Sequence, residues 1–254
     1  MDFLTILWHL LILLMSFALI NYGIALVLKR NDVADVSWGI GFILVCLYFY
    51  ISGSTSPLAL LVYLLVVLWG FRLSFYIGIR NSKKEEDFRY KKWRMQWGKH
   101  FYWRSLLQVF VLQMLILLVI SSPIIVAAIA EESAYLSLLQ VIGIVGWIAG
   151  FMWQAIADYQ LSAFKRKNTG KVLSSGLWKY SRHPNYFGEI VMWWSLFLMV
   201  LEIEHGIWAI ISPVLITYLL TSVSGVPMLE EKYKTNDEYR AYVDRTPSIF
   251  PFFK

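Results

Sequence analysis

The chain alternates long apolar stretches with short, charge-rich ones. Charged residues are absent from the runs 3–28, 36–71, 105–130, 133–157, 190–201 and 206–229. A helix that crosses the hydrocarbon core of a bilayer needs about 20 apolar residues. These runs therefore predict membrane-spanning helices.

Two of the runs do not correspond to one helix each. The run 36–71 is too long for one span, and the turn-forming residues 52–57 (Ser-Gly-Ser-Thr-Ser-Pro) divide it. The run 190–201 becomes a full span if its helix begins near Pro184 and carries Glu189 inside. The pattern predicts an all-α polytopic membrane protein, one integral domain over 1–254, with helices near 3–28, 36–52, 57–79, 105–130, 134–163, 185–201 and 206–228.

The basic residues test this count of seven. All 23 Lys and Arg residues fall in or beside the loops that follow the first, third, fifth and seventh helices. Cytoplasmic loops carry the excess of Lys and Arg, so the N-terminus is expected outside and the C-terminus in the cytoplasm. The expected location is separately a bacterial inner membrane. The charged residues expected on the other side are all acidic: Asp2, Glu131, Glu132, Glu202 and Glu204.

The composition also indicates a membrane protein, and together with the motifs it excludes several function classes. Hydrophobic residues make up 58% of the chain and charged residues only 16%, where soluble domains carry about 25%. Because topology accounts for the positive charge, no nucleic-acid partner is expected. The four histidines are far apart and Cys46 is the single cysteine, so no metal site is predicted. The G-x-G-x-x-G, P-loop and G-x-S-x-G motifs are absent from the sequence.

Four charged residues lie near the inner ends of predicted helices: Asp35, Arg72, Asp158 and Glu189. Charges at such positions usually face a cavity or a partner. On the fifth helix, Asp158 belongs to a polar stripe on one face, formed by Gln154, Asp158, Ser162 and Lys165. The stripe indicates a pocket wall; the alternative is a helix end that leaves the bilayer.

The segment 176–189, Gly-Leu-Trp-Lys-Tyr-Ser-Arg-His-Pro-Asn-Tyr-Phe-Gly-Glu, is the most distinctive. Pro184 is typical of a first helical residue, and the helix amides near Arg182 and His183 would form an anion site. Arg182, Asn185 and Glu189 are spaced to share one helix face. Asn185 and Glu189 suit an amide or a ribose, while Arg182 and His183 suit phosphate. The alternative is an ordinary surface pair.

Two further elements have alternative interpretations. Arg89 can reach a phosphate or pair with Glu85, and Asp32 or Asp35 can cap the second helix or belong to a site. The aromatic and basic residues of the loop before residue 105 form either an interfacial belt or a cytosolic cap over a site.

From Gln154 to Glu189 the sequence resembles the steroid 5α-reductase superfamily. The resemblance rests on Gln154-x3-Asp158, on Lys165, on Gly176-Leu177-x2-Tyr180-Ser181-x3-Asn185-x2-Gly188-Glu189, and on the tail Tyr239…Ile249-x-Pro251-Phe252. An uncharacterised bacterial and plant branch is similar also at Asp35-x2-Trp38 and Glu86-Asp87-x-Arg89-Tyr90. The related isoprenylcysteine carboxyl methyltransferases have a segment similar to Arg182-His183-Pro184-x-Tyr186.

This resemblance implies seven transmembrane helices and NADPH in a cavity open to the cytosol, with residues 140–254 as the cofactor-binding half. The Tyr that polarises the substrate carbonyl in the steroid enzymes corresponds to Trp69, which cannot protonate a carbonyl. Asp35 and Glu189 are therefore the catalytic candidates. The residues assigned to the cofactor are Arg72, Arg89, Tyr90, Gln154, Asp158, Lys165, Tyr180, Arg182, His183, Asn185, Tyr186 and Glu189.

The expected activity is an NADPH-dependent reduction of a carbon–carbon double bond conjugated to a carbonyl. The substrate would be lipidic or steroid-like and would enter from the bilayer. Two alternatives stay open: an S-adenosylmethionine-dependent carboxyl methyltransferase acting on a lipid or an isoprenylcysteine, and a non-enzymatic transporter or lipid-binding protein.

Overall fold

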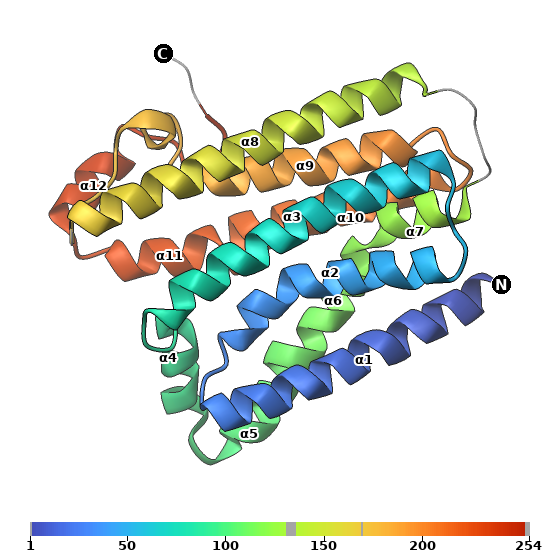
Figure 1. The fold of residues 1–254 in the computed structure, drawn as a ribbon. Helices are drawn as coiled ribbons and strands as arrows, with labels where there is room; N and C mark the ends of the chain where they lie inside the picture. The colour runs from blue at the N-terminus through green and yellow to red at the C-terminus, as the bar shows by residue number, and fades with distance from the viewer. Residues whose placement is uncertain (1, 131–135, 169, 252–254) are drawn as a thin grey trace. The chain divides into compact units, whose positions relative to one another are not determined.

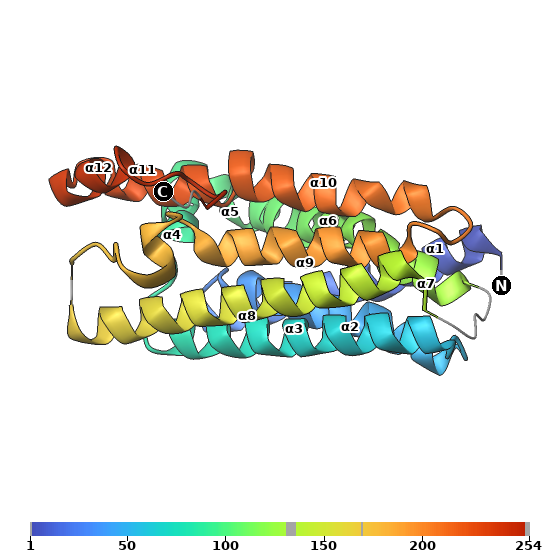
Figure 2. The same ribbon diagram turned by 90° about the horizontal axis from the view of Figure 1, so that it is seen from above.

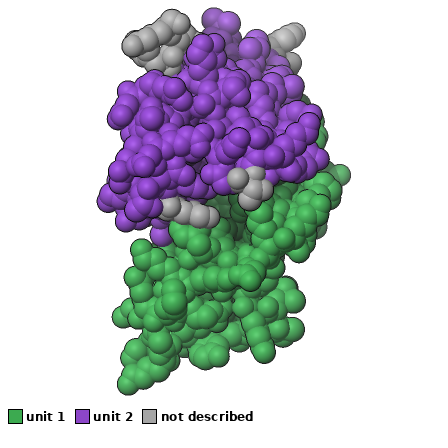
Figure 3. Space-filling model, turned by 90° about the vertical axis from the view of Figure 1, so that its left-hand side faces the viewer, with its two compact units in different colours: residues 1–134 green, residues 135–254 purple. Residues whose placement is uncertain are grey.

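The computed structural model describes residues 2–130, 136–168 and 170–251. Within these ranges the chain forms helices joined by turns and contains no β-strand. It divides into two compact units, Met1–Ala134 and Tyr135–Lys254, which are coloured separately in Figure 3. Each unit is described by itself, and the predicted cofactor-binding half, 140–254, falls within the second.

The first unit begins with three long helices (Figure 1). They are α1 (Phe3–Leu28), α2 (Val33–Ile51) and α3 (Pro57–Ser82). The Asp2 carboxylate caps α1 by accepting from the amide of Thr5 at 2.7 Å. The rest of the unit consists of α4 (Phe88–Trp97), the 3₁₀ turn η1 (Gly98–His100), α5 (Phe101–Arg104), the π-helical η2 (Ser105–Val111), α6 (Leu112–Ile120) and α7 (Ser122–Ile129).

Glycines let α2 and α3 approach closely. A Cβ atom added to Gly70 would lie 2.8 Å from the carbonyl oxygen of Gly39, so neither position has room for a side chain. Close approach of this kind is typical of packed membrane helices, because small residues bring the backbones into van der Waals contact.

The second unit is built on α8 (Leu138–Lys167) and α9 (Pro184–Val200), which run side by side in Figures 1 and 2. Ser137 and Gln140 form a capping box at the start of α8. The remaining elements are η3 (Gly176–Lys179), η4 (Gly206–Ile210), α10 (Ile211–Tyr218), η5 (Leu219–Val223), α11 (Val226–Tyr233) and α12 (Asp237–Val243).

Glycines also set the distance between α8 and α9. A Cβ atom on Gly188 would lie 2.6 Å from the carbonyl oxygen of Gly150, and one on Gly150 would lie 2.7 Å from that of Gly188. The two backbones touch at this point. As a result, short polar side chains one or two turns away can reach across the helix pair.

Among the described residues, six helical stretches are long and apolar enough to cross a membrane. They are Phe3–Leu28, Val33–Ile51, Pro57–Ser82, Phe88–Ile120, Leu138–Lys167 and Gly206–Glu231. The 17-residue α9 is shorter than these. The chain is thus an α-helical membrane protein, and the predicted seventh span stays a prediction.

Some predicted boundaries are wrong. The expected helix 105–130 is interrupted at Ser121, because Pro123 has no N–H to continue the ladder, and the helical stretch instead reaches back to Phe88. The second helix begins at Val33 rather than 36. The predicted start at 134, the acidic Glu131 and Glu132, and Phe252 of the similarity pattern lie outside the described residues.

Candidate functional site

Four polar side chains link α8 to α9 in the interior of the second unit. The Gln154 amide donates to a Glu189 carboxylate oxygen at 3.0 Å, and the Asn185 amide donates to Asp158 at 3.3 Å. Gln154, Asp158 and Glu189 are only 2%, 4% and 7% exposed. We call Gln154, Asp158, Asn185 and Glu189 the α8–α9 polar ladder.

The ladder follows from the spacing of small and polar residues. Gly150, Gln154 and Asp158 stand four residues apart on α8, and Gly188 adjoins Glu189 on α9. The glycine contact brings the backbones together, and Gln154, one turn beyond Gly150 on α8, reaches Glu189 beside Gly188 on α9. The amides donate and the carboxylates accept, so the cluster can bond a sugar hydroxyl or a carboxamide. Along the predicted stripe, Ser162 is half-buried and Lys165 is exposed.

The spacing predicts that Arg182 shares a helix face with Asn185 and Glu189, and the structure shows that it does not. Arg182 precedes Pro184, the first residue of α9, and the backbone at His183 is not helical, so Arg182 is not part of that helix. Its guanidinium donates to Glu230 at 2.9 Å and to the carbonyl oxygens of Val243 and Thr246. His183 also meets Glu230, at 3.3 Å, and its ring stacks on that of Tyr186.

The backbone N–H groups of Arg182 and His183, which precede α9, have partners within the chain, while the predicted anion site at the first amides of the helix stays a prediction. The amide of Arg182 donates to the carbonyl of Pro247 at 2.9 Å, and the amide of His183 donates to that of Ser248 at 3.0 Å. These N–H groups are therefore used by the chain itself. Spacing along one helix could not reveal this pairing, because the acceptors lie more than sixty residues further along the chain.

Residues 242–249 form a strap against the segment 176–183. Besides the two backbone bonds, the Tyr242 hydroxyl donates to the carbonyls of Trp178 and Ser181, and the Ser181 hydroxyl donates to that of Ser248. Burial raises the pKa of Tyr242, so its hydroxyl stays protonated and remains a donor.

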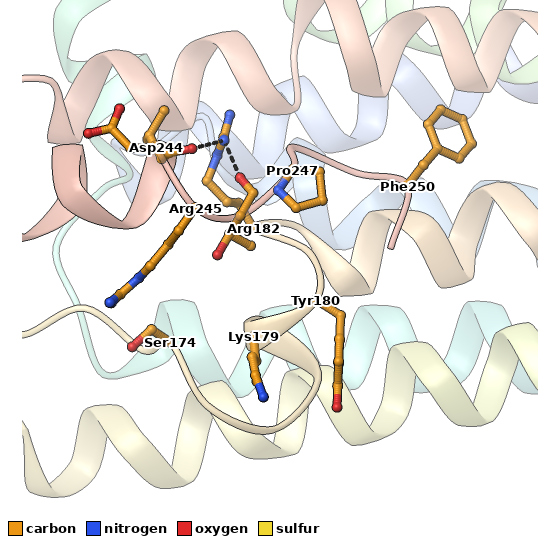
Figure 4. A pocket seen from close by; sticks show the side chains of 10 residues that line it. Ser174, Lys179, Tyr180, Arg182, Asp244, Arg245, Pro247 and Phe250 are labelled. Atoms are coloured by element: carbon orange, nitrogen blue, oxygen red, sulfur yellow. Dashed lines mark hydrogen bonds between the residues drawn. The ribbon is translucent and has the colours of Figure 1, made fainter. Parts of the chain in front are cut away.

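The strap and the segment 174–182 line an open cavity of about 720 Å³ (Figure 4). Two residues assigned to the cofactor from the sequence, Tyr180 and Arg182, line it. Lys179 and Arg245 line it as well, and sequence reasoning missed both, since no periodicity relates positions so far apart. The remaining lining residues are Ser174, Val243, Asp244, Thr246, Pro247 and Phe250.

The first unit contains its own polar cluster, around Asp35 in the first turn of α2. Arg89 donates to the Asp35 carboxylate at 2.6 Å, and the buried Tyr90 hydroxyl donates to it at 2.7 Å. Arg89 also binds Asp87 at 2.9 Å. Glu85, the partner considered for Arg89 from the sequence, pairs with Lys91 instead. The two carboxylates already hold Arg89, so a phosphate contact would have to replace them.

Asp32 stands at the N-cap position of α2 but makes no side-chain capping bond. Its carboxylate binds Arg30 at 2.7 Å and accepts from the amide of Asp87 at 3.1 Å. Asp32 therefore ties the turn before α2 to the turn before α4. Of the other predicted residues, Arg72 is half-buried on α3 and Trp69 is buried on the same helix.

Comparison with known proteins identifies relatives whose functions are not established. Residues 21–246 match the model of a family described as "Protein of unknown function (DUF1295)". The uncharacterized protein C594.04c of Schizosaccharomyces pombe (strain 972 / ATCC 24843) is 25% identical over 274 residues, which cover 94% of this chain and 78% of that protein. No solved structure matches the chain.

Proposed function

The chain belongs to the DUF1295 family, and from that premise we propose that it is a membrane-embedded, NADPH-dependent reductase. It reduces a carbon–carbon double bond conjugated to a carbonyl in a lipidic or steroid-like substrate. The observation that supports the proposal is the α8–α9 polar ladder, because carboxylates and amides buried between apolar helices are costly and mark functional sites by default.

The chemistry of the ladder fits such a cofactor. The Asp158 and Glu189 carboxylates accept from ribose hydroxyls, and the Gln154 and Asn185 amides offer both donors and acceptors to a carboxamide. Lys165, exposed further along the same face of α8, supplies a cation for a phosphate. When bound, the cofactor supplies a hydride.

The catalytic candidates from the sequence are Glu189, in the ladder, and Asp35, in the first unit. Hydride addition at the β-carbon develops negative charge on the carbonyl oxygen, which needs a hydrogen-bond donor, and the α-carbon then takes a proton. Asp35 is held by Arg89 and Tyr90, which fix the orientation of its carboxylate.

We propose further that α9 is the seventh span. Its 17 residues are at the lower end of the range that crosses a bilayer, about 17–25. Seven spans place the N-terminus outside and all basic loops in the cytoplasm, as expected in a bacterial inner membrane. The substrate then arrives laterally from the lipid, and the basic face attracts the anionic cofactor.

The test is a thermal-shift titration of the purified full chain in nanodiscs. NADPH is expected to stabilise it by about 2.7 kcal/mol at 100 times its Kd. Glu189→Gln and Asp158→Asn are expected to weaken binding about tenfold each, through the loss of a charge-assisted hydrogen bond. The matched control is Glu204→Gln, whose carboxylate is exposed.

Two outcomes would reject the proposal. Stabilisation by S-adenosylmethionine without any by NADPH would favour the methyltransferase alternative. Stabilisation by neither ligand, with unchanged behaviour of the Glu189 and Asp158 variants, would favour a transporter or lipid-binding protein.

A further inference from the structure

We propose that the cavity between the strap and the segment 174–182 binds an anionic phosphate group that is carried on a ligand with an apolar or aromatic part. The cavity contains none of the ladder residues, although two of its lining residues, Tyr180 and Arg182, are assigned to the cofactor from the sequence. The cavity has about 720 Å³, within the range of about 300–1,000 Å³ typical of small-molecule sites.

The charges of the lining residues indicate an anion. Three cations, Lys179, Arg182 and Arg245, line the cavity with one carboxylate, Asp244, and Arg182 is paired with Glu230 outside the lining. Figure 4 shows the Asp244 carboxylate directed away from the ends of the Lys179 and Arg245 side chains. Cations that line a concave surface add their fields and concentrate counter-ions there.

The three cations have different roles in the cavity. Arg182 is bound by Glu230 and by two strap carbonyls, so it holds the wall of the cavity together. Lys179 and Arg245 make no ion pair within the described ranges, and their donors remain available to a ligand. A guanidinium grips phosphate with two parallel hydrogen bonds, and an ammonium adds a point charge.

The other lining residues give the cavity an apolar end. Pro247 and Phe250 come from the strap side, and the Tyr180 ring lies 5.6 Å from the Lys179 ammonium. A nucleotide offers a base to such surfaces, and a lipid offers its acyl chains. The phosphate chemistry is common to both sources.

The cavity is accessible and already formed. All of its lining residues lie outside the candidate spans Leu138–Lys167 and Gly206–Glu231, so a ligand reaches it from the water or the headgroup layer. The hydrogen bonds of the strap fix both walls before any ligand arrives, which lowers the entropy lost on binding.

The test uses the full chain in phosphatidylcholine nanodiscs and two probes. Binding of 2′,5′-ADP is measured by calorimetry against adenosine. Retention of phosphatidylglycerol is measured by native mass spectrometry against phosphatidylcholine. At least one anionic probe is expected to bind, and Lys179→Gln with Arg245→Gln to weaken it about tenfold or more. Lys234→Gln, at an exposed cation outside the cavity, is the control and should bind as the wild type does.

Binding of 2′,5′-ADP alone would identify a nucleotide phosphate, and retention of phosphatidylglycerol alone would identify a lipid phosphate. The proposal fails if neither anionic probe exceeds its uncharged or zwitterionic counterpart. It fails also if the double variant binds as tightly as the wild type. Should the double variant lose thermal stability, Lys179→Gln alone decides, because this exposed side chain makes no ion pair in the described part of the chain.

Discussion

At the scale of single residues, the buried polar side chains depend on specific partners. Glu189 is 7% exposed and lies on the mostly apolar helix α9, and the Gln154 amide donates to its carboxylate. A buried group that loses its partner pays its full desolvation cost. Stability measurements can therefore test the ladder independently of any activity.

Gln154→Leu removes that donor and keeps a similar volume. We expect a loss of about 1–3 kcal/mol in the free energy of unfolding, since the Glu189 carboxylate stays buried without this bond. The measurement is unfolding of the purified chain in mixed micelles with increasing denaturing detergent. Gln96→Leu, at an exposed position on α4, should change stability by no more than about 0.5 kcal/mol. Equal effects of the two variants would contradict the importance of the ladder.

Asp87, between α3 and α4, predicts a pH dependence. Burial alone would raise the pKa of its carboxyl, but the hydrogen bonds and charge of Arg89 outweigh burial and hold this pKa below the ordinary value of 3.8. The folded chain thus binds the proton more weakly than the unfolded chain. The resulting stability is fully present at neutral pH and is lost as the pH falls through the ordinary carboxyl range toward the folded pKa.

Asp87→Asn should therefore flatten the decline of the thermal midpoint between about pH 5 and about pH 3. Asp237→Asn is the matched control: its ion pair with Arg240 is exposed and contributes little, so this variant should keep the wild-type profile. A wild-type profile in Asp87→Asn would show that the Arg89 contact does not stabilise the fold.

At the scale of elements, the glycine contact between α8 and α9 determines whether the ladder can form. Gly188→Ala places a methyl group 2.6 Å from the Gly150 carbonyl and should cost about 1–3 kcal/mol by forcing the helices apart. Gly23→Ala on α1 meets nothing within 4 Å and should stabilise its helix by up to about 1 kcal/mol. Thermal unfolding of both variants checks the pair, and a neutral Gly188→Ala would contradict the close packing.

The elements also show what the sequence could and could not predict. The ends of α1 follow from the charged residues that flank its apolar run, and the start of α9 follows from Pro184. The structure confirms both. The pairing of Gln154 with Glu189 and of Asp158 with Asn185 agrees with their helical spacing. The partners of Arg182 and Asp35 could not be predicted, because they lie on segments remote in sequence and only the fold brings them together.

At the scale of the whole molecule, the proposed topology makes a prediction about sidedness. With α9 as a span, Glu204 lies outside and Lys84 inside. A membrane-impermeant maleimide should label Glu204→Cys in intact cells, and Lys84→Cys only after permeabilisation. The native Cys46 is 2% exposed and gives little background. If α9 does not cross, Glu204→Cys will be labelled only after permeabilisation.

The strap has a consequence for the order of folding. Arg182 and Thr246 are 64 residues apart, and the helices α9, α10, α11 and α12 lie between them. Closing so long a loop costs entropy that no local contact repays, so these bonds form only after the intervening helices are in place. We expect the strap also to open first, with amide hydrogen exchange at Arg182 and His183 faster than in the middle of α9. The phosphate cavity would then be the last part of this unit to assemble and the first to be lost under mild denaturation, and a bound anion would slow exchange at the same two amides.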